Sequence, residues 1–138
     1  MKIIFNWSQM NEMISKLISD IQNSQKKYDC VVGIKHGGIP ISSLIAKTLN
    51  IPHKQVHISF YDNSCIEGDI GDCENLLIVD DLIDSGKTMA AFKDRFGNGD
   101  VAVIFWKKDA EHYQESPEFY VEEKPSHWVV FPWENNGQ

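Results

Sequence analysis

Apolar residues recur along this chain in two alternating patterns, helical spacing and short continuous runs. Between Asn6 and Ile21 they fall three or four positions apart, which is the spacing of one buried helix face. Asn6 and Gln9 have the side chains of a capping box at the start of this segment. The pattern therefore predicts a helix over residues 6–21, whose core-facing residues are Met10, Met13, Ile14, Leu17, Ile18 and Ile21.

Three runs are apolar at nearly every position, as expected of strands buried on both faces of a parallel sheet. They are residues 30–34, 76–79 and 101–106, and residues 56–61 form a further predicted strand. Helical spacing returns after the first and second runs. It comprises Ile41, Leu44, Ile45 and Leu49 behind Pro40, then Met89, Phe92 and Phe96 before a glycine-rich stop at residues 97–99. This alternation predicts an α/β fold around a central parallel sheet.

Polar residues follow each predicted strand. Residues 35–38, the segment that begins at Asp62, residues 80–88 and Lys107 all occupy such positions. The carboxyl ends of parallel strands meet at one edge of the sheet, where open α/β folds bind their ligands. We therefore expect these four features to converge on one cleft.

The most informative of them is the sequence DDLIDSGKT at residues 80–88. Its small, hydroxylated turn leads into a helix, whose free N–H groups and dipole favour a phosphate. The two acids before the turn suit hydroxyl groups or a divalent metal. Taken singly, each part also occurs as a plain turn or a cap. A P-loop is excluded, because it needs a glycine five residues before Gly86, where this chain has Asp81.

Three other segments leave alternatives open. The sequence KHGG at residues 35–38 is either a close backbone approach to a ligand or a tight turn with an exposed lysine. The polar segment 62–74 is thirteen residues long, and is either a mobile lid or a disordered surface loop. Near the end of the chain, Trp128 and Trp133 either pack against the core or offer aromatic surface to a ligand.

Composition narrows the class of protein. The 138 residues suffice for one domain with one core. A formal net charge of −7 argues against a general nucleic-acid or anionic-membrane surface. The three cysteines include no C-x-x-C pair and cannot all pair with one another, so a reducing cytoplasm without structural zinc is expected. The first residues lack the apolar length of a signal peptide, and no stretch could span a bilayer.

The sequence DDLIDSGKT resembles the binding motif for 5-phosphoribosyl-1-pyrophosphate (PRPP) in the type I phosphoribosyltransferases. The resemblance implies the α/β type I phosphoribosyltransferase fold as a single domain over residues 1–138, with a central parallel sheet flanked by helices. A small C-terminal cover for the base is implied over about residues 107–138. The implied PRPP-binding residues are Lys35, His36, Gly37, Asp80, Asp81, Asp84, Ser85, Gly86, Lys87 and Thr88.

Three further segments narrow the resemblance to 6-oxopurine phosphoribosyltransferases of the bacterial xanthine-guanine type. They are SFYD at residues 59–62, FWK at residues 105–107 and HWVVFPWE at residues 127–134. The implied reaction is purine salvage, in which the phosphoribosyl group of PRPP passes to guanine, xanthine or hypoxanthine. Nucleoside monophosphate and pyrophosphate are then the products.

The resemblance also implies individual roles. Asp84 would be the catalytic residue and would face N7 of the purine. Lys107 would reach O6, Trp128 would stack on the ring, and the backbone of Val129 would meet the 2-position edge.

Mg²⁺ is the implied cofactor, held by Asp81 and its neighbour Asp80, with Glu134 near a second ion. The implied partners are PRPP and a purine base, without nucleic acid or stable membrane insertion. A homodimer or homotetramer in the cytoplasm is implied in the same way.

Two departures from the family pattern keep a second function open. His36 stands where a basic residue often precedes the two glycines, and segment 62–74 carries acids but no Lys or Arg. A nucleotide-binding or PRPP-binding regulator without efficient turnover is therefore the alternative. A phosphotransferase is disfavoured by the missing P-loop glycine.

Overall fold

The computed structural model describes residues 1–60 and 65–134. Within them, the centre is a seven-stranded sheet in the spatial order β4-β3-β2-β5-β7-β6, with β8 paired to β7. Neighbouring strands are parallel except for β3 and β4, so the predicted α/β sheet is confirmed. Its strands are β2 (Cys30–Lys35), β3 (His53–Ser59), β4 (Cys65–Glu67), β5 (Leu76–Val79), β6 (Leu82–Ile83), β7 (Asp100–Trp106) and β8 (Phe119–Glu123).

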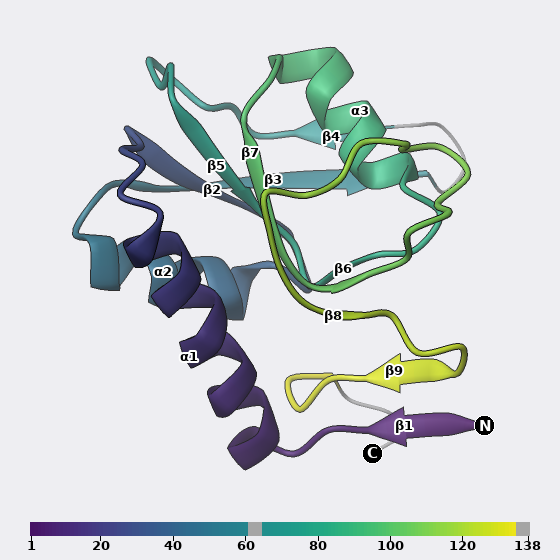
Figure 1. Cartoon of the computed structure of the whole chain (residues 1–138). Coiled ribbons are helices and arrows are strands. Elements are labelled where there is room, and N and C mark those ends of the chain that lie inside the picture. The colour runs from purple at the N-terminus through teal and green to yellow at the C-terminus, as the bar shows by residue number, and fades with distance from the viewer. Residues whose placement is uncertain (61–64, 135–138) are drawn as a thin grey trace.

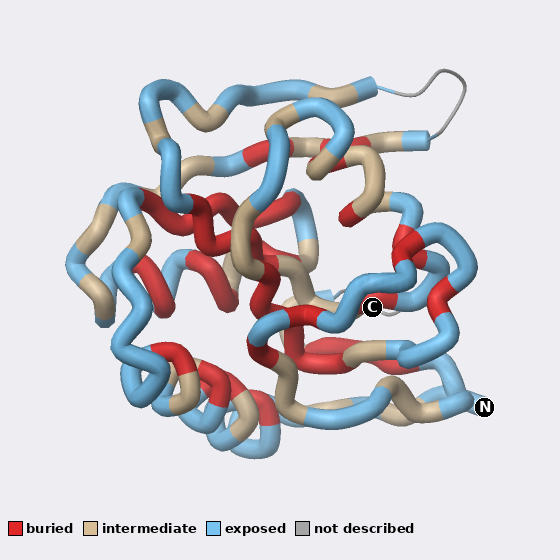
Figure 2. Tube along the Cα trace, turned by 45° about the horizontal axis from the view of Figure 1, so that its top comes forward, coloured by how far each residue is buried: buried red, intermediate tan, exposed pale blue. Residues whose placement is uncertain are grey.

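Helices cover both faces of this sheet (Figure 1). Helices α1 (Trp7–Asn23) and α2 (Ile39–Leu49) lie on one face, and α3 (Lys87–Phe96) lies on the other. Alternate strand residues contribute to two hydrophobic cores, one on each face of the sheet. Leu77 and Val79 pack with the first two helices in the first core, whereas Ile78 packs with α3 in the second. Figure 2 shows that the buried residues concentrate in the central strands and on the inner faces of the helices.

The first two helices follow their sequence signals, with one exception. Asn6 and Gln9 form the predicted capping box at the start of α1. On α2, Ile41 and Ile45 are buried, but Leu44 was wrongly assigned to the same face and is 42% exposed. At 100° per residue, Leu44 points well away from the centre of the buried stripe.

The second predicted strand and the loop after it need correction. Pairing with β2 brings His53 opposite Val31, so β3 starts three residues before the predicted Val56 and ends at Ser59. Tyr61 and residues 62–64 lie outside the described residues. Within the polar segment, β4 pairs with β3 in the antiparallel sense, with Ile66 opposite Ile58. The sequence analysis missed this strand, because Ile66 is an isolated apolar residue.

The end of the chain forms short strands that belong to two different sheets. Strand β8 extends the central sheet, because Phe119 is buried and Glu118 Oε1 accepts a hydrogen bond from the Val101 N–H at 2.7 Å. Strand β9 (Trp128–Val130) instead pairs with β1 (Lys2–Ile4), a strand that the sequence analysis missed. These two strands form a small separate sheet beside the carboxyl edge of β7 (Figure 1).

Cysteine pairing departs from the expectation of a reduced protein. Cys30, at the start of β2, is joined by a disulfide to Cys73, near the end of the segment before β5. Cys65 is a free, exposed thiol.

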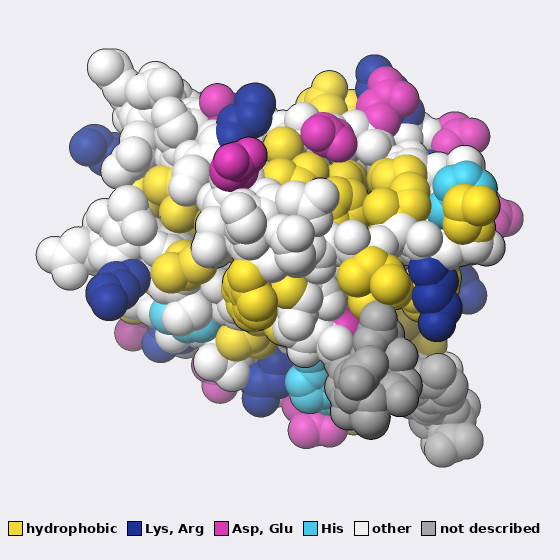
Figure 3. Space-filling model, turned by 90° about the horizontal axis from the view of Figure 1, so that it is seen from below, with side chains coloured by type: hydrophobic (Ala, Val, Ile, Leu, Met, Phe, Trp, Pro, Cys, Tyr) yellow, Lys and Arg dark blue, Asp and Glu magenta, His cyan; other side chains and the backbone are white. Residues whose placement is uncertain are grey.

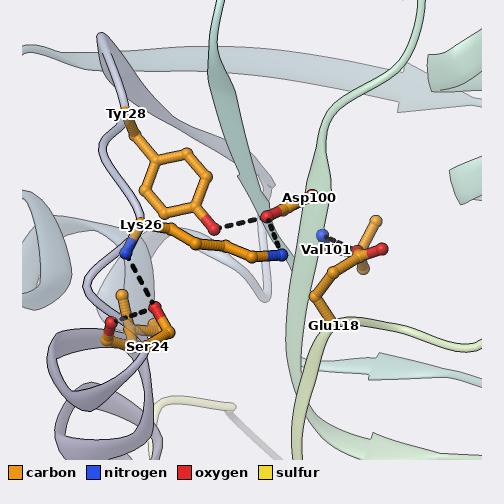
Figure 4. A network of polar contacts seen from close by, with 7 residues as sticks. Ser24, Lys26, Tyr28, Asp100, Val101 and Glu118 are labelled. Atoms are coloured by element: carbon orange, nitrogen blue, oxygen red, sulfur yellow. Dashed lines mark hydrogen bonds and ion pairs between the residues drawn. The ribbon is translucent and has the colours of Figure 1, made fainter.

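A polar network ties the amino-terminal edge of the sheet together (Figure 4). Asp100 Oδ2 accepts hydrogen bonds from Tyr28 Oη at 2.5 Å and from Lys26 Nζ at 3.1 Å. Burial and the Asp100 carboxylate raise the pKa of the Tyr28 hydroxyl, so Tyr28 remains a neutral donor. These contacts stabilise the amino-terminal edge of the sheet. The predicted site residues lie at the opposite, carboxyl edge.

Candidate functional site

Asp80 and Asp81, the acid pair, lie between β5 and β6, which follow one edge of β7. The main chain stays bonded to β7 through this break. The Asp80 N–H donates to the Ala102 carbonyl at 3.2 Å, and the Asp81 carbonyl accepts from the Ile104 N–H at 3.0 Å. The backbone therefore holds both acids at the centre of the sheet's carboxyl edge.

Burial makes the acid pair costly to ionise. It raises the pKa of Asp80 well above the usual range, and the Asp81 charge raises it further. Burial also raises the pKa of Asp81, with a smaller contribution from Glu134. A divalent cation would relieve this repulsion, and hard carboxylate oxygens are the ligands that Mg²⁺ prefers. The acid pair therefore fits the Mg²⁺ that the sequence implied.

Glu134 has another contact. Its Oε1 accepts a hydrogen bond from the Phe131 N–H at 2.8 Å. Within residues 1–60 and 65–134, no three His, Cys, Asp or Glu side chains are gathered so that they could hold a metal. A cation at the acid pair would therefore need further oxygen ligands from substrate or water.

The two glycines after β2 let the KHGG loop lie against the acid pair. A Cβ on Gly37 would overlap Oδ2 of Asp81, and a Cβ on Gly38 would overlap the carbonyl oxygen of Val79. Of the two alternatives that the sequence left open, the structure shows a tight turn after an exposed Lys35, and the turn lies against the acid pair. The peptide bond between Lys35 and His36 is cis.

Residues 84–88, the 84–88 turn, connect β6 to α3. Gly86 has φ 86°, in the left-handed region that favours glycine, and an added Cβ would crowd Tyr113. The turn and the acid pair line a cavity of about 180 Å³. Helix α3 begins here without an acidic residue in its first turn, so its free N–H groups and positive dipole end suit an anion.

The 84–88 turn has a second support that the sequence analysis missed. The His112 N–H donates to the Ser85 carbonyl at 2.8 Å, and Tyr113 packs against Gly86. A backbone contact between segments so far apart in the chain leaves no side-chain pattern to detect. Residues 112 and 113 therefore help to hold the turn in place.

Asp84 also lines a larger cavity of about 540 Å³, the Trp128 pocket, which contains Lys107 and Trp128. Lys107 Nζ lies 4.0 Å from Asp84 Oδ1, and both side chains are about half exposed. Trp128 is 66% exposed. The fold therefore brings three predicted residues together from distant segments, with Asp84 common to both cavities.

Trp133 and Val129 are placed differently. The Trp133 ring stacks on Phe131 with centroids 4.9 Å apart and packs against the first core. Val129 is buried in that core, while the residues that flank β1, Met1 and Phe5, bond to the Trp128 N–H and the Val130 carbonyl. By the alternation of a parallel ladder, the N–H and carbonyl of Val129 point away from β1.

Comparison with known proteins identifies the relatives of this chain. A family model described as "Phosphoribosyl transferase domain" matches residues 1–135. The crystal structure of a purine phosphoribosyltransferase from Pyrococcus horikoshii Ot3 is similar, with a TM-score of 0.78 and 27% identity, covering 96% of this chain and 94% of that one.

Two further solved structures share the fold. The xanthine-guanine-hypoxanthine phosphoribosyltransferase of Helicobacter pylori has a TM-score of 0.79 at 17% identity, covering 98% of this chain and 95% of that one. A hypothetical protein from Neisseria gonorrhoeae with bound ppGpp has a TM-score of 0.79 at 24% identity, covering 99% and 90%. The fold is therefore that of the type I phosphoribosyltransferases.

Proposed function

This chain belongs to the phosphoribosyltransferase family, and on that premise we propose that it transfers the phosphoribosyl group of PRPP to a 6-oxopurine. The observation that carries the proposal is the position of Asp84. It lines both the cavity of the 84–88 turn and the Trp128 pocket, with Lys107 Nζ 4.0 Å from its carboxylate. A reaction that joins a ribose phosphate to a base needs the two binding cavities to be adjacent, and a residue that lines both of them meets this need.

The ribose-phosphate half is assigned to the acid pair and the 84–88 turn. Ser85, Gly86, Lys87 and Thr88 would hold the 5-phosphate at the start of α3. Asp80 would contact the ribose hydroxyls, and Lys35, His36 and Gly37 would contact the pyrophosphate. The neighbouring loop supports this, because Gly37 lies against Asp81.

The base half is assigned to the Trp128 pocket. The Lys107 ammonium can only donate hydrogen bonds, so it would select the O6 acceptor of guanine, xanthine or hypoxanthine. The exposed Trp128 ring would stack on the base. The outward backbone of Val129 would meet the 2-position edge.

The reaction then displaces pyrophosphate from C1 of PRPP. The bond between C1 and the pyrophosphate oxygen breaks with its electrons leaving on that oxygen, and a purine nitrogen forms the new bond to C1. Ionised Asp84 would accept the proton released from N7 or orient it. The fixed turn and acid pair would supply positioning and charge stabilisation. Asp81 and Asp80 would hold Mg²⁺, with Glu134 near a second ion, and the bound metal would supply charge neutralisation for the leaving pyrophosphate.

A second candidate is a regulator that binds a nucleotide or PRPP without efficient turnover. The absence of Lys and Arg from segment 62–74 favours it, because that segment cannot bring a lysine or arginine cation to the substrate. The related Neisseria gonorrhoeae protein was crystallised with a guanine nucleotide, ppGpp. The two functions differ in turnover, which can be measured directly.

The deciding experiment incubates the protein with Mg²⁺, PRPP and each of guanine, xanthine, hypoxanthine and adenine. We expect nucleoside monophosphate and pyrophosphate to form in equal amounts from at least one 6-oxopurine. Binding of PRPP or a guanine nucleotide without product would favour the regulator. Neither binding nor product would refute both candidates.

Assembly and location belong to the same proposal. Apolar side chains gather in separate patches on the face seen in Figure 3. Ile4 and Trp7 are among the exposed large hydrophobic residues of the molecule. We infer a homodimer or homotetramer in the cytoplasm. Within the described residues, no helix has the length and apolar character to cross a membrane. A reducing cytoplasm would reduce the Cys30–Cys73 disulfide. Titration of free thiols therefore tests the proposed cytoplasmic location.

A further inference from the structure

A third cavity lies at the carboxyl ends of β2 and β3, beside the site already described. It has a volume of about 380 Å³ and is lined by Lys35, His36, His57, Ile58, Ser59 and Phe60. Among these lining residues, three have basic side chains and none is acidic. Although the chain has a formal net charge of −7, the charge of this lining suits an anion.

His57 belongs to this cavity through the register of the sheet. Lys35 of β2 stands opposite His57 of β3 in the parallel ladder. The rings of His36 and His57 lie with centroids 5.2 Å apart and planes tilted by 49°. The end of β2, the loop after it and the neighbouring strand β3 therefore present one lysine and two imidazoles to the same cavity.

The position of this cavity relates it to the proposed reaction. His36 precedes Gly37, which lies against Asp81 of the acid pair. His36, which lines the cavity, is thus the chain neighbour of the glycine beside the acid pair. A PRPP molecule with its 5-phosphate on the 84–88 turn must place its pyrophosphate elsewhere along this edge. The KHGG loop is the neighbouring element, and the cavity provides room beside it.

We propose that His57 binds the pyrophosphate group of PRPP together with His36, so that one imidazole from β3 and one from the KHGG loop contact the same anion. This inference rests on the proposed function and adds a residue that the motif does not contain. An imidazole donates from one ring nitrogen when neutral and from both when charged. Hydrogen bonds from such donors to phosphate oxygens are among the stronger ones in proteins. Ile58 and Phe60 would form the apolar wall behind them.

The test compares His57→Leu with His57→Lys and with Gln55→Ala, an exposed control on the same strand. Calorimetry with inorganic pyrophosphate at fixed Mg²⁺ measures the site without turnover. We expect His57→Leu to weaken pyrophosphate binding roughly tenfold or more, the effect of one charge-assisted hydrogen bond. His57→Lys should recover most of that loss, and Gln55→Ala should leave binding unchanged.

Steady-state kinetics separates a binding role from a structural one. His57→Leu should raise KM for PRPP by a similar factor, while KM for the base and the affinity for nucleoside monophosphate, which lacks pyrophosphate, stay within about twofold. Equal losses for all ligands, or unchanged pyrophosphate affinity, would overturn the inference. Pyrophosphate binding that depends on His57 in a protein without turnover would refute the transferase function and leave the inference standing.

Discussion

The two halves of the proposed site are built in different ways. The ribose-phosphate half comes from nine consecutive residues, 80–88, whose main chain bonds to β7 and to His112. The base half gathers Asp84, Lys107 and Trp128 from three distant segments, and the exposure of these residues runs from 48% to 66%. The first half is fixed by the backbone, so substitutions there should change charge more than shape. The second depends on where individual side chains reach, so each substitution should change the choice or affinity of the base.

The largest effect is expected from Asp80→Asn combined with Asp81→Asn. Binding of Mg-PRPP should be lost in calorimetric titration, because the amides remove the charges that suit a divalent cation. The fold should persist, since the anchoring bonds are made by the backbone. Asp94→Asn on the exposed face of α3 is the matched control. Unchanged Mg-PRPP affinity in the double variant would remove the acid pair from the site.

The same variant should be more stable than the wild type at pH 7. Both folded-state pKa values are raised, so the pair lowers the free energy of unfolding progressively as pH rises from the ordinary carboxyl range, roughly 3.9, through the raised values. Neutral amides remove that destabilisation. Thermal melts from pH 4 to pH 8 should show a stability difference that grows with pH, and a parallel offset would contradict the pKa argument.

The sequence predicted the parts built from consecutive residues and missed the parts assembled from distant segments. The motif at residues 80–88 is contiguous, so the acid pair, the turn and the start of α3 could be read from spacing and turn chemistry. The pairing of β9 with β1 could not, because it depends on two short strands from opposite ends of the chain. His57 was missed for a related reason: only the register of β3 against β2 brings it beside His36.

The choice of base provides the next largest effect. Adenine presents an amino donor at its 6-position, which would leave the Lys107 ammonium unpaired. The wild type should therefore use adenine roughly 10⁴-fold less well than its best 6-oxopurine, measured as kcat/KM. Lys107→Met should lose 6-oxopurine activity and most of this discrimination.

Lys108→Met is the control for Lys107, because Lys108 lines the same pocket but its Nζ lies 2.6 Å from Glu123 Oε1. It should behave like the wild type. Efficient use of adenine by the wild type would contradict the assignment. Loss of activity in Lys108→Met with none in Lys107→Met would transfer the role to Lys108.

Asp84→Asn tests the residue that joins the two halves. An amide cannot accept the purine proton, so turnover should fall on the order of 10²-fold or more while PRPP affinity changes little. Asp109→Asn, an exposed acid that lines the Trp128 pocket, should leave both unchanged. Single-turnover kinetics with saturating PRPP measures the turnover rate of each variant. Turnover within a few-fold of the wild type would reduce Asp84 to a turn residue.

The smallest effect concerns the two tryptophans near the end of the chain. Trp128 is 66% exposed and lines the Trp128 pocket, whereas Trp133 is partly buried, stacks on Phe131 and packs against the first core. Trp128→Ala should therefore weaken base binding by roughly 1–3 kcal/mol, by analogy with bases stacked on aromatic side chains of nucleic-acid-binding proteins. Quenching of intrinsic fluorescence by a nucleoside monophosphate should disappear with it. Trp133→Phe should keep the quenching and lower thermal stability instead, because it removes buried contacts. Quenching that is lost in Trp133→Phe and kept in Trp128→Ala would exchange the two roles and place the base against the core.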